Sequence, residues 1–157
     1  MDVSQYLEIF IDETREHLQS LNEQILVLER EPENVDTINE IFRAAHSLKG
    51  MAGTMGYKRM QALTHDMENV FSEVRNGAIK VNAEIIDVLF QILDALDEYL
   101  NNIQSSADEG TNDNENLIKF IRLVNDGTIK IRNRSKSDLK VDLKKHEITD
   151  VVLNCPI

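Results

Sequence analysis

The sequence has little cysteine and no long apolar run. Cys155 is the single cysteine, which excludes an internal disulfide framework and fits a reducing compartment. The N-terminus shows no basic region followed by an apolar run, so no signal peptide is visible. No apolar stretch approaches the roughly 18 residues that a membrane-spanning helix needs. These absences predict a cytoplasmic location without membrane insertion.

The chain also lacks an excess of basic residues. It has 17 Lys and Arg against 28 Asp and Glu, which gives a net charge of −11. Residues 128–157 are locally basic, with seven basic and four acidic side chains, so residues 1–127 carry a net charge of −14. Because phosphate backbones attract basic surfaces, this acidic body argues against a nucleic acid partner.

Nucleotide-binding motifs are missing as well. The sequence has no Gly-x-x-x-x-Gly-Lys-Ser/Thr loop, no kinase glycine loop and no Asp-x-Gly set placed for Mg²⁺. Phosphoryl transfer from ATP requires a nucleotide site and metal ligands. If this chain takes part in phosphate chemistry, we expect it to be a substrate and carrier of phosphate, and its standing as an enzyme is uncertain.

Apolar residues that recur at spacings of three and four predict amphipathic helices over most of the chain. With short connections and one apolar stripe per helix, they predict an all-α fold. We expect an antiparallel up-down four-helix bundle with a fifth, shorter C-terminal helix. The expected helices run from about Ser4 to before Pro32, from Val35 to a close at Gly53–Gly56, from Tyr57 to Asn76–Gly77, from a cap at Asn82 to 104–110, and through Leu117 to 125–127.

The end of the chain differs in character from the rest. Residues 128–140 are polar and basic and are typical of a linker, whereas 141–153 show partial alternation followed by a short apolar run. We therefore expect one domain over 1–127, and a linker or tail over 128–157 that leads toward a missing downstream domain.

The second expected helix contains an unusual histidine. His46 lies about 100° from the apolar stripe and therefore points toward solvent. Lys49, Gly50 and Gly53 follow at +3, +4 and +7 and share its face. A glycine inside a helix costs about 1 kcal/mol relative to alanine, and here two of them flank one imidazole. Either they clear the surface around a histidine that accepts a phosphoryl group, or they let a neighbouring helix pack tightly and His46 is incidental.

The third expected helix offers His65 and Glu68, three residues apart on a shared face. An accepting histidine needs one ring nitrogen free and the other held as a donor, which a carboxylate can do. Both residues could also be ordinary exposed polar side chains. A metal site is a further alternative, although di-iron bundles use Glu-x-x-His on two helices and the order here is His-x-x-Glu, once.

The sequence His-Ser-Leu-Lys-Gly at 46–50, with the Met-Ala-Gly-Thr-Met-Gly that follows, resembles the phosphoacceptor motif of histidine phosphotransfer (HPt) domains. It is most similar to the N-terminal domains of bacterial chemotaxis kinases of the CheA family. The resemblance covers roughly residues 4–125. It implies that His46, Lys49, His65 and Glu68 form one hydrogen-bonded group. In that group Glu68 holds Nδ1 of His46 and leaves Nε2 to take the phosphate, while Lys49 offsets phosphate charge.

The resemblance also implies partners. A separate ATP-binding domain of the same kinase would phosphorylate His46, and the phosphoryl group would pass to an aspartate of response-regulator receivers. ATP and Mg²⁺ would come from those partner domains, with no cofactor or metal bound by this chain. Dimerisation of such kinases belongs to a later domain, so we expect a monomer. A stand-alone HPt protein of a phosphorelay remains the alternative, with a metal-binding helical bundle as a weaker one.

Overall fold

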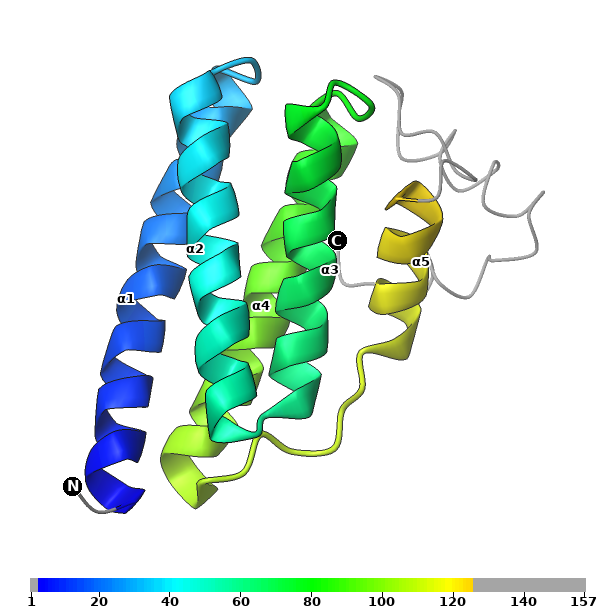
Figure 1. Cartoon of the computed structure of the whole chain (residues 1–157). Coiled ribbons are helices and arrows are strands. Elements are labelled where there is room, and N and C mark those ends of the chain that lie inside the picture. The colour runs from blue at the N-terminus through cyan, green and yellow to red at the C-terminus, as the bar shows by residue number, and fades with distance from the viewer. Residues whose placement is uncertain (1–2, 126–157) are drawn as a thin grey trace.

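The computed structural model describes residues 3–125, and the elements within that range are all α-helices. They are α1 (Val3–Arg30), α2 (Val35–Met55), α3 (Lys58–Arg75), α4 (Ala83–Ser106) and α5 (Glu115–Asn125). The first four helices lie side by side and alternate in direction, and α5 lies outside them against α3 (Figure 1). The predicted four-helix bundle with a shorter fifth helix is confirmed. The predicted boundary at residue 127 and the tail at 128–157 lie outside the described residues.

The helix ends follow from the residues that occupy them. The Asn34 side chain accepts a hydrogen bond from the Thr37 amide at the start of α2, and the Asn82 side chain accepts one from the Ile85 amide at the start of α4. Gly56 ends α2 in the left-handed conformation, with φ of 79°, which a residue without Cβ adopts at little cost. The caps predicted at Asn82 and Gly56 are therefore present.

The core is formed by one apolar stripe from each helix. The predicted apolar stripes of α3, α4 and α5 are buried in full, whereas Leu7, Ile11, Phe42 and Met55 are half-buried at the edge of the core. Within residues 3–125, none of the helices combines the length and apolarity that a membrane span requires. The fully buried side chains with the largest volumes are Tyr99, Phe71, Leu21, Ile25, Leu28, Ile41, Leu48, Met60, Leu63, Met67, Ile85 and Leu89.

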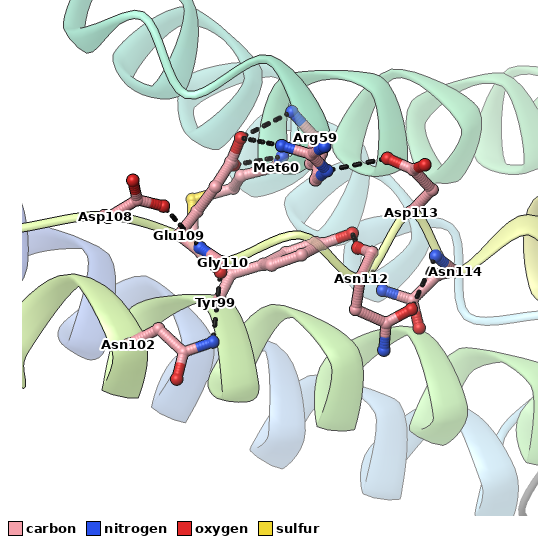
Figure 2. Close-up of polar contacts among 10 residues, drawn as sticks. All are labelled: Arg59, Met60, Tyr99, Asn102, Asp108, Glu109, Gly110, Asn112, Asp113 and Asn114. Atoms are coloured by element: carbon pink, nitrogen blue, oxygen red, sulfur yellow. Dashed lines mark hydrogen bonds and ion pairs between the residues drawn. The ribbon is translucent and has the colours of Figure 1, made fainter.

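The loop between α4 and α5 holds the start of α3 in place. Tyr57, the N-cap residue of α3, provides no side-chain cap. Instead Glu109 is buried against this helix end and accepts hydrogen bonds from the amides of Arg59 and Met60, at 3.0 and 2.9 Å (Figure 2). A carboxylate also suits the positive end of the helix dipole. Glu109 thus caps α3 from a distance of about fifty residues in sequence.

Other polar contacts hold this loop in shape. The Arg59 side chain is 36% exposed, and its guanidinium lies 2.6 Å from Oδ1 of Asp113 and 3.8 Å from Oε2 of Glu109. The Tyr99 hydroxyl donates to the carbonyl of Asn112 at 2.6 Å, and the Asn102 amide donates to the carbonyl of Glu109 at 3.0 Å (Figure 2). Because Tyr99 and Asn102 belong to α4, these bonds tie α4, the loop and α3 together. We call the contacts of Glu109 with Arg59 and Met60 the Glu109 clamp.

Candidate functional site

The antiparallel packing of α2 against α3 brings His46 and Glu68 together. Nδ1 of His46 lies 2.8 Å from Oε2 of Glu68. The histidine side chain is 65% exposed and the glutamate is 14% exposed, so a mostly shielded carboxylate holds a mostly exposed ring. Within residues 3–125, no hydrogen bond or ion pair to Nε2 of His46 accompanies this one. The predicted orientation of His46 toward solvent is therefore observed, and Glu68 makes the contact that the resemblance implies.

Lys49 occupies the other oxygen of the same carboxylate. Its ammonium donates to Oε1 of Glu68 at 3.0 Å, and its side chain is 26% exposed. Glu68 is thus shared between His46 and Lys49, which lie three residues apart on α2. The Lys49 ammonium is therefore hydrogen-bonded to the same carboxylate that holds the imidazole.

The charge state of Glu68 follows from these contacts. Burial is the largest single influence and opposes ionisation, but the hydrogen bonds from Lys49 and His46, together with their charges, outweigh it. The pKa of Glu68 therefore lies below its ordinary value. The carboxylate stays ionised at neutral pH and accepts a hydrogen bond from the protonated Nδ1 of His46. The neutral ring therefore carries its lone pair on Nε2.

The two glycines near His46 prove to differ. A Cβ added to Gly50 would meet nothing within 4 Å, so the surface one turn beyond His46 is open. A Cβ added to Gly53 would lie 2.5 Å from Nε2 of Gln61 and 3.1 Å from its Cδ. The predicted role of Gly53 in clearing access is therefore corrected, because the Gln61 side chain from α3 already covers it. The role of Gly50 in access stays a prediction, and Gly53 follows the packing alternative.

His65 is not part of the group around Glu68. Its side chain is exposed, and the contacts found in the described part of the chain include no hydrogen bond or ion pair between His65 and His46, Lys49 or Glu68. Three residues before Glu68, its side chain is rotated by about 60° around α3, away from α2. The predicted four-residue network is therefore corrected to His46, Lys49 and Glu68.

Three contacts form one line along the exposed side of the α2 and α3 pair, and we call this line the α2–α3 seam. Gln61 faces Gly53, Glu68 faces His46, and Arg75 covers Phe42 with its guanidinium carbon 4.5 Å from the ring centroid. Residues 61, 68 and 75 are seven apart, so they lie on one face of α3. Sequence reasoning missed the contacts of Gln61 and Arg75. The seven-residue spacing from Glu68 is the signal that could have found them.

The site is suited to phosphoryl chemistry by its arrangement. Within the described residues it offers a ring nitrogen without a hydrogen bond or ion pair, a carboxylate that fixes the tautomer, a nearby ammonium and an open approach over Gly50. Among residues 3–125 there is no group of three or more His, Cys, Asp or Glu side chains placed to hold a metal ion. No observation in this part of the chain thus favours the metal alternative.

Comparisons with known proteins agree on one family. The model of the Hpt domain family matches residues 5–116. The chemotaxis protein CheA of Bacillus subtilis (strain 168) is 47% identical over 108 residues, which cover 69% of this chain and 16% of that protein. The chain therefore spans less than a fifth of the length of this curated relative.

Solved structures show the same likeness. The solution structure of the histidine phosphotransfer domain of CheA matches with a TM-score of 0.71 at 40% identity, covering 78% of this chain and 92% of that one. The phosphorylated P1 domain of CheA3, crystallised in complex with CheY6 from R. sphaeroides, gives a TM-score of 0.71 at 22% identity, covering 78% and 97%. At that identity the second likeness concerns the fold.

Proposed function

The chain belongs to the Hpt domain family, in the form found in CheA, and we propose that it is the phosphoacceptor and phosphocarrier domain of a chemotaxis two-component histidine kinase. In this proposal His46 is phosphorylated by a separate ATP-binding domain and then passes the phosphoryl group to an aspartate of a response-regulator receiver. ATP and Mg²⁺ belong to those partner domains. The cytoplasmic location and the monomeric state of this chain remain predictions.

The observation that carries the proposal is the pairing of an exposed His46 ring with a shielded Glu68 carboxylate at 2.8 Å. Because Nδ1 keeps its proton in this hydrogen bond, the lone pair of Nε2 is free to attack phosphorus without prior deprotonation. A bond forms between Nε2 and the γ-phosphorus of ATP, and the bond from that phosphorus to the bridging oxygen of ADP breaks. Positive charge then develops on the ring, and the ionised Glu68 stabilises it.

Transfer to the receiver reverses the role of His46. The receiver carboxylate attacks the phosphorus, the bond from Nε2 breaks, and the ring leaves as a neutral imidazole whose Nδ1 proton is still hydrogen-bonded to Glu68. His46 must enter two active sites in turn, which its 65% exposure and the open surface over Gly50 both support. Lys49 lies close enough to exchange its bond to Glu68 for one to a bound phosphate.

The receiver as partner is supported by the fold. The P1 domain of CheA3, which shares this fold, was crystallised in its phosphorylated form with CheY6. A stand-alone HPt protein of a phosphorelay is the second candidate, and the 47% identity to a CheA protein favours the kinase instead. ATP-binding and adaptor-binding domains encoded downstream of this chain would support the kinase, whereas a gene that ends near residue 157 would overturn that choice.

The test is phosphorylation of the purified chain. We would mix it with ATP and Mg²⁺, with and without a CheA-type catalytic domain, and measure an acid-labile phosphoryl group by intact mass. We expect the label only with the added catalytic domain, its absence in His46→Gln, and its loss when a receiver is added. A folded chain that takes no label under any condition would overturn the proposal.

A further inference from the structure

Arg75 lies on the same exposed face as His46 and stacks on an aromatic ring. Its guanidinium carbon lies 4.5 Å from the centroid of the Phe42 ring, and Phe42 precedes His46 by four residues, one turn, on α2. On α3, Arg75 lies seven residues beyond Glu68, so it follows Glu68 along the α2–α3 seam by about 10 Å. The Phe42 ring is half-buried and fixed by the core, which restricts the arginine that stacks on it.

This position falls within the area that any docked partner must cover. A specific interface buries about 800 Å² on each partner, a patch roughly 30 Å across. Arg75 lies about 10 Å along α3 from Glu68, which faces His46. A partner centred on His46 therefore covers Arg75 as well. At the other end of the seam the neutral side chain of Gln61 covers Gly53. The seam therefore has a cationic end at Arg75 and a neutral end at Gln61.

Arg75 carries a positive charge in a domain that is acidic overall. Residues 1–127 carry a net charge of −14, which opposes association with an acidic partner. On the seam, however, Glu68 is paired with Lys49, and the Arg75 guanidinium rests on an aromatic ring with no carboxylate ion-paired to it within residues 3–125. In the proposed function the receiver supplies the acceptor aspartate and the Mg²⁺, which proteins bind through carboxylates, so we expect the surface around its acceptor site to be acidic.

We propose that Arg75, stacked on Phe42, is a docking residue that recognises the acidic rim of the receiver acceptor site and orients the receiver over His46. The proposal rests on the function proposed above and adds to it a residue that sequence motifs do not mark. A guanidinium restrained by stacking loses less conformational freedom on forming charged hydrogen bonds than a free side chain does. Arg75 thus acts on association with the receiver and leaves the reactivity of His46 unchanged.

The test is receiver binding by the unphosphorylated chain, measured over a series of salt concentrations. We expect Arg75→Ala to raise Kd by about threefold to tenfold at low salt and to converge with the parent chain at high salt, as loss of a steering charge does. Arg75→Lys, which keeps the charge, should lie between the two. Arg15→Ala is the matched control, because Arg15 bonds Gln104 of α4 at 2.6 Å, on the α1–α4 side of the bundle, and its loss removes the same charge.

Two outcomes would overturn the proposal. One is an equal change of Kd in Arg75→Ala and Arg15→Ala, which would show only an effect of net charge. The other is unchanged receiver binding together with slower phosphorylation by the ATP-binding domain, which would assign Arg75 to the kinase step. Because binding requires no phosphoryl group, a failure of His46 to be phosphorylated would reject the proposed function separately.

Discussion

In the proposed function, single residues of this site divide the tasks of phosphoryl transfer between them. His46 would supply the reactive nitrogen, Glu68 would fix the tautomer from a shielded position, and Lys49 would balance charge. Because both oxygens of Glu68 are engaged, its pKa is depressed even though burial opposes ionisation. Each task belongs to a separate side chain, so each can be tested by a conservative substitution.

Glu68→Gln should slow phosphorylation of His46 by about tenfold to a hundredfold, the scale seen when the partner that orients a ligating histidine is lost. The amide oxygen can still accept from Nδ1, but the negative charge that stabilises the ring is gone. The measurement is the initial rate with a CheA-type catalytic domain, beside the thermal midpoint of unfolding. Glu73→Gln, which removes the same charge from another position on α3, is the control. A parental rate in Glu68→Gln would remove Glu68 from the mechanism.

Gly50→Leu should reduce phosphoryl transfer at least about tenfold while leaving stability equal or higher. Leucine has the better helix propensity by about 0.8 kcal/mol, and its Cβ meets nothing within 4 Å in the free domain. A docked partner, however, would meet the added side chain one turn from His46, and small misplacements of reacting atoms cost large factors in rate. Gly50→Ala should be affected less. Equal transfer rates in the leucine variant and the parent chain would contradict the role of Gly50 in access.

Asp66 should make the domain less stable as the pH rises. This α3 carboxylate is buried, and burial raises its pKa above the ordinary value despite the charge and hydrogen bond of Arg122, which lies 3.5 Å away, and the charge of His65. Between the unfolded pKa and the raised folded pKa the native state binds more protons. The free energy of unfolding therefore falls as the pH rises through that interval. Asp66→Asn should remove this fall and gain stability relative to the parent at pH 7, measured by urea unfolding at several pH values. A constant difference between the two chains from about pH 3 to pH 7 would contradict it.

At the scale of elements, α3 joins the functional side of the bundle to the Glu109 clamp. It contributes Glu68 and Arg75 to the seam on one side and packs against α5 on another. Its own N-cap residue, Tyr57, provides no side-chain cap, so its first turn depends on a carboxylate from the α4–α5 loop. The position of the site helix is therefore set partly by a loop that lies far from His46 in sequence.

Glu109→Ala should destabilise the domain by about 1–3 kcal/mol, because it leaves the amides of Arg59 and Met60 without their acceptor in a buried place. Glu109→Gln keeps one acceptor oxygen and should lose less. The measurement is the free energy of unfolding from urea titration. Asp113→Ala is the control, since the side chain of Asp113 is 69% exposed and its ion pair with Arg59 should contribute little. Equal losses in the Glu109→Ala and Asp113→Ala variants would contradict the capping role.

At the scale of the whole molecule, α1 to α4 form the bundle and α5 lies outside it against α3, although its buried side chains join the same core (Figure 1). α4 is buried against α1 and α3 over most of its length, whereas α5 packs mainly on α3. Its buried side chains are Leu117, Phe120, Ile121 and Val124. Local opening therefore requires the loss of fewer contacts in α5 than in the bundle helices.

Hydrogen exchange should reveal this order. We expect the amides of α5 to exchange faster than those in the middle of α4, which should open only with global unfolding. The measurement is exchange followed by mass spectrometry of peptides from both helices, at a pH where intrinsic rates are matched. Equal protection of α5 and α4 would show that the fifth helix belongs to the same cooperative unit.

The helix boundaries and the buried stripes could be predicted because periodicity and caps are local properties of the sequence. The contact of Glu68 with His46 followed from resemblance, and spacing alone left it open. His65, Gly53 and Glu109 could not be assigned, because their environments depend on how two helices or a loop and a helix are aligned. The seven-residue spacing from Glu68 could have placed Arg75 on the seam face, but not its contact with Phe42. Periodicity identifies the face of a helix on which a residue lies, but not the element that this face meets. The prediction therefore grouped His65 with Glu68, although the two side chains point in different directions.

The Glu109 clamp also has a consequence for synthesis of the chain on the ribosome. The carboxylate that caps α3 is translated about fifty residues after the amides that it receives. At about 5–20 residues per second, the first turn of α3 waits roughly 2 to 10 s for its cap. His46 and Glu68 are therefore both made, and their helices can pair, while that end of α3 still frays. Nascent chains that stop short of Glu109 should contain the residues of the site on a helix whose first turn is not yet secured.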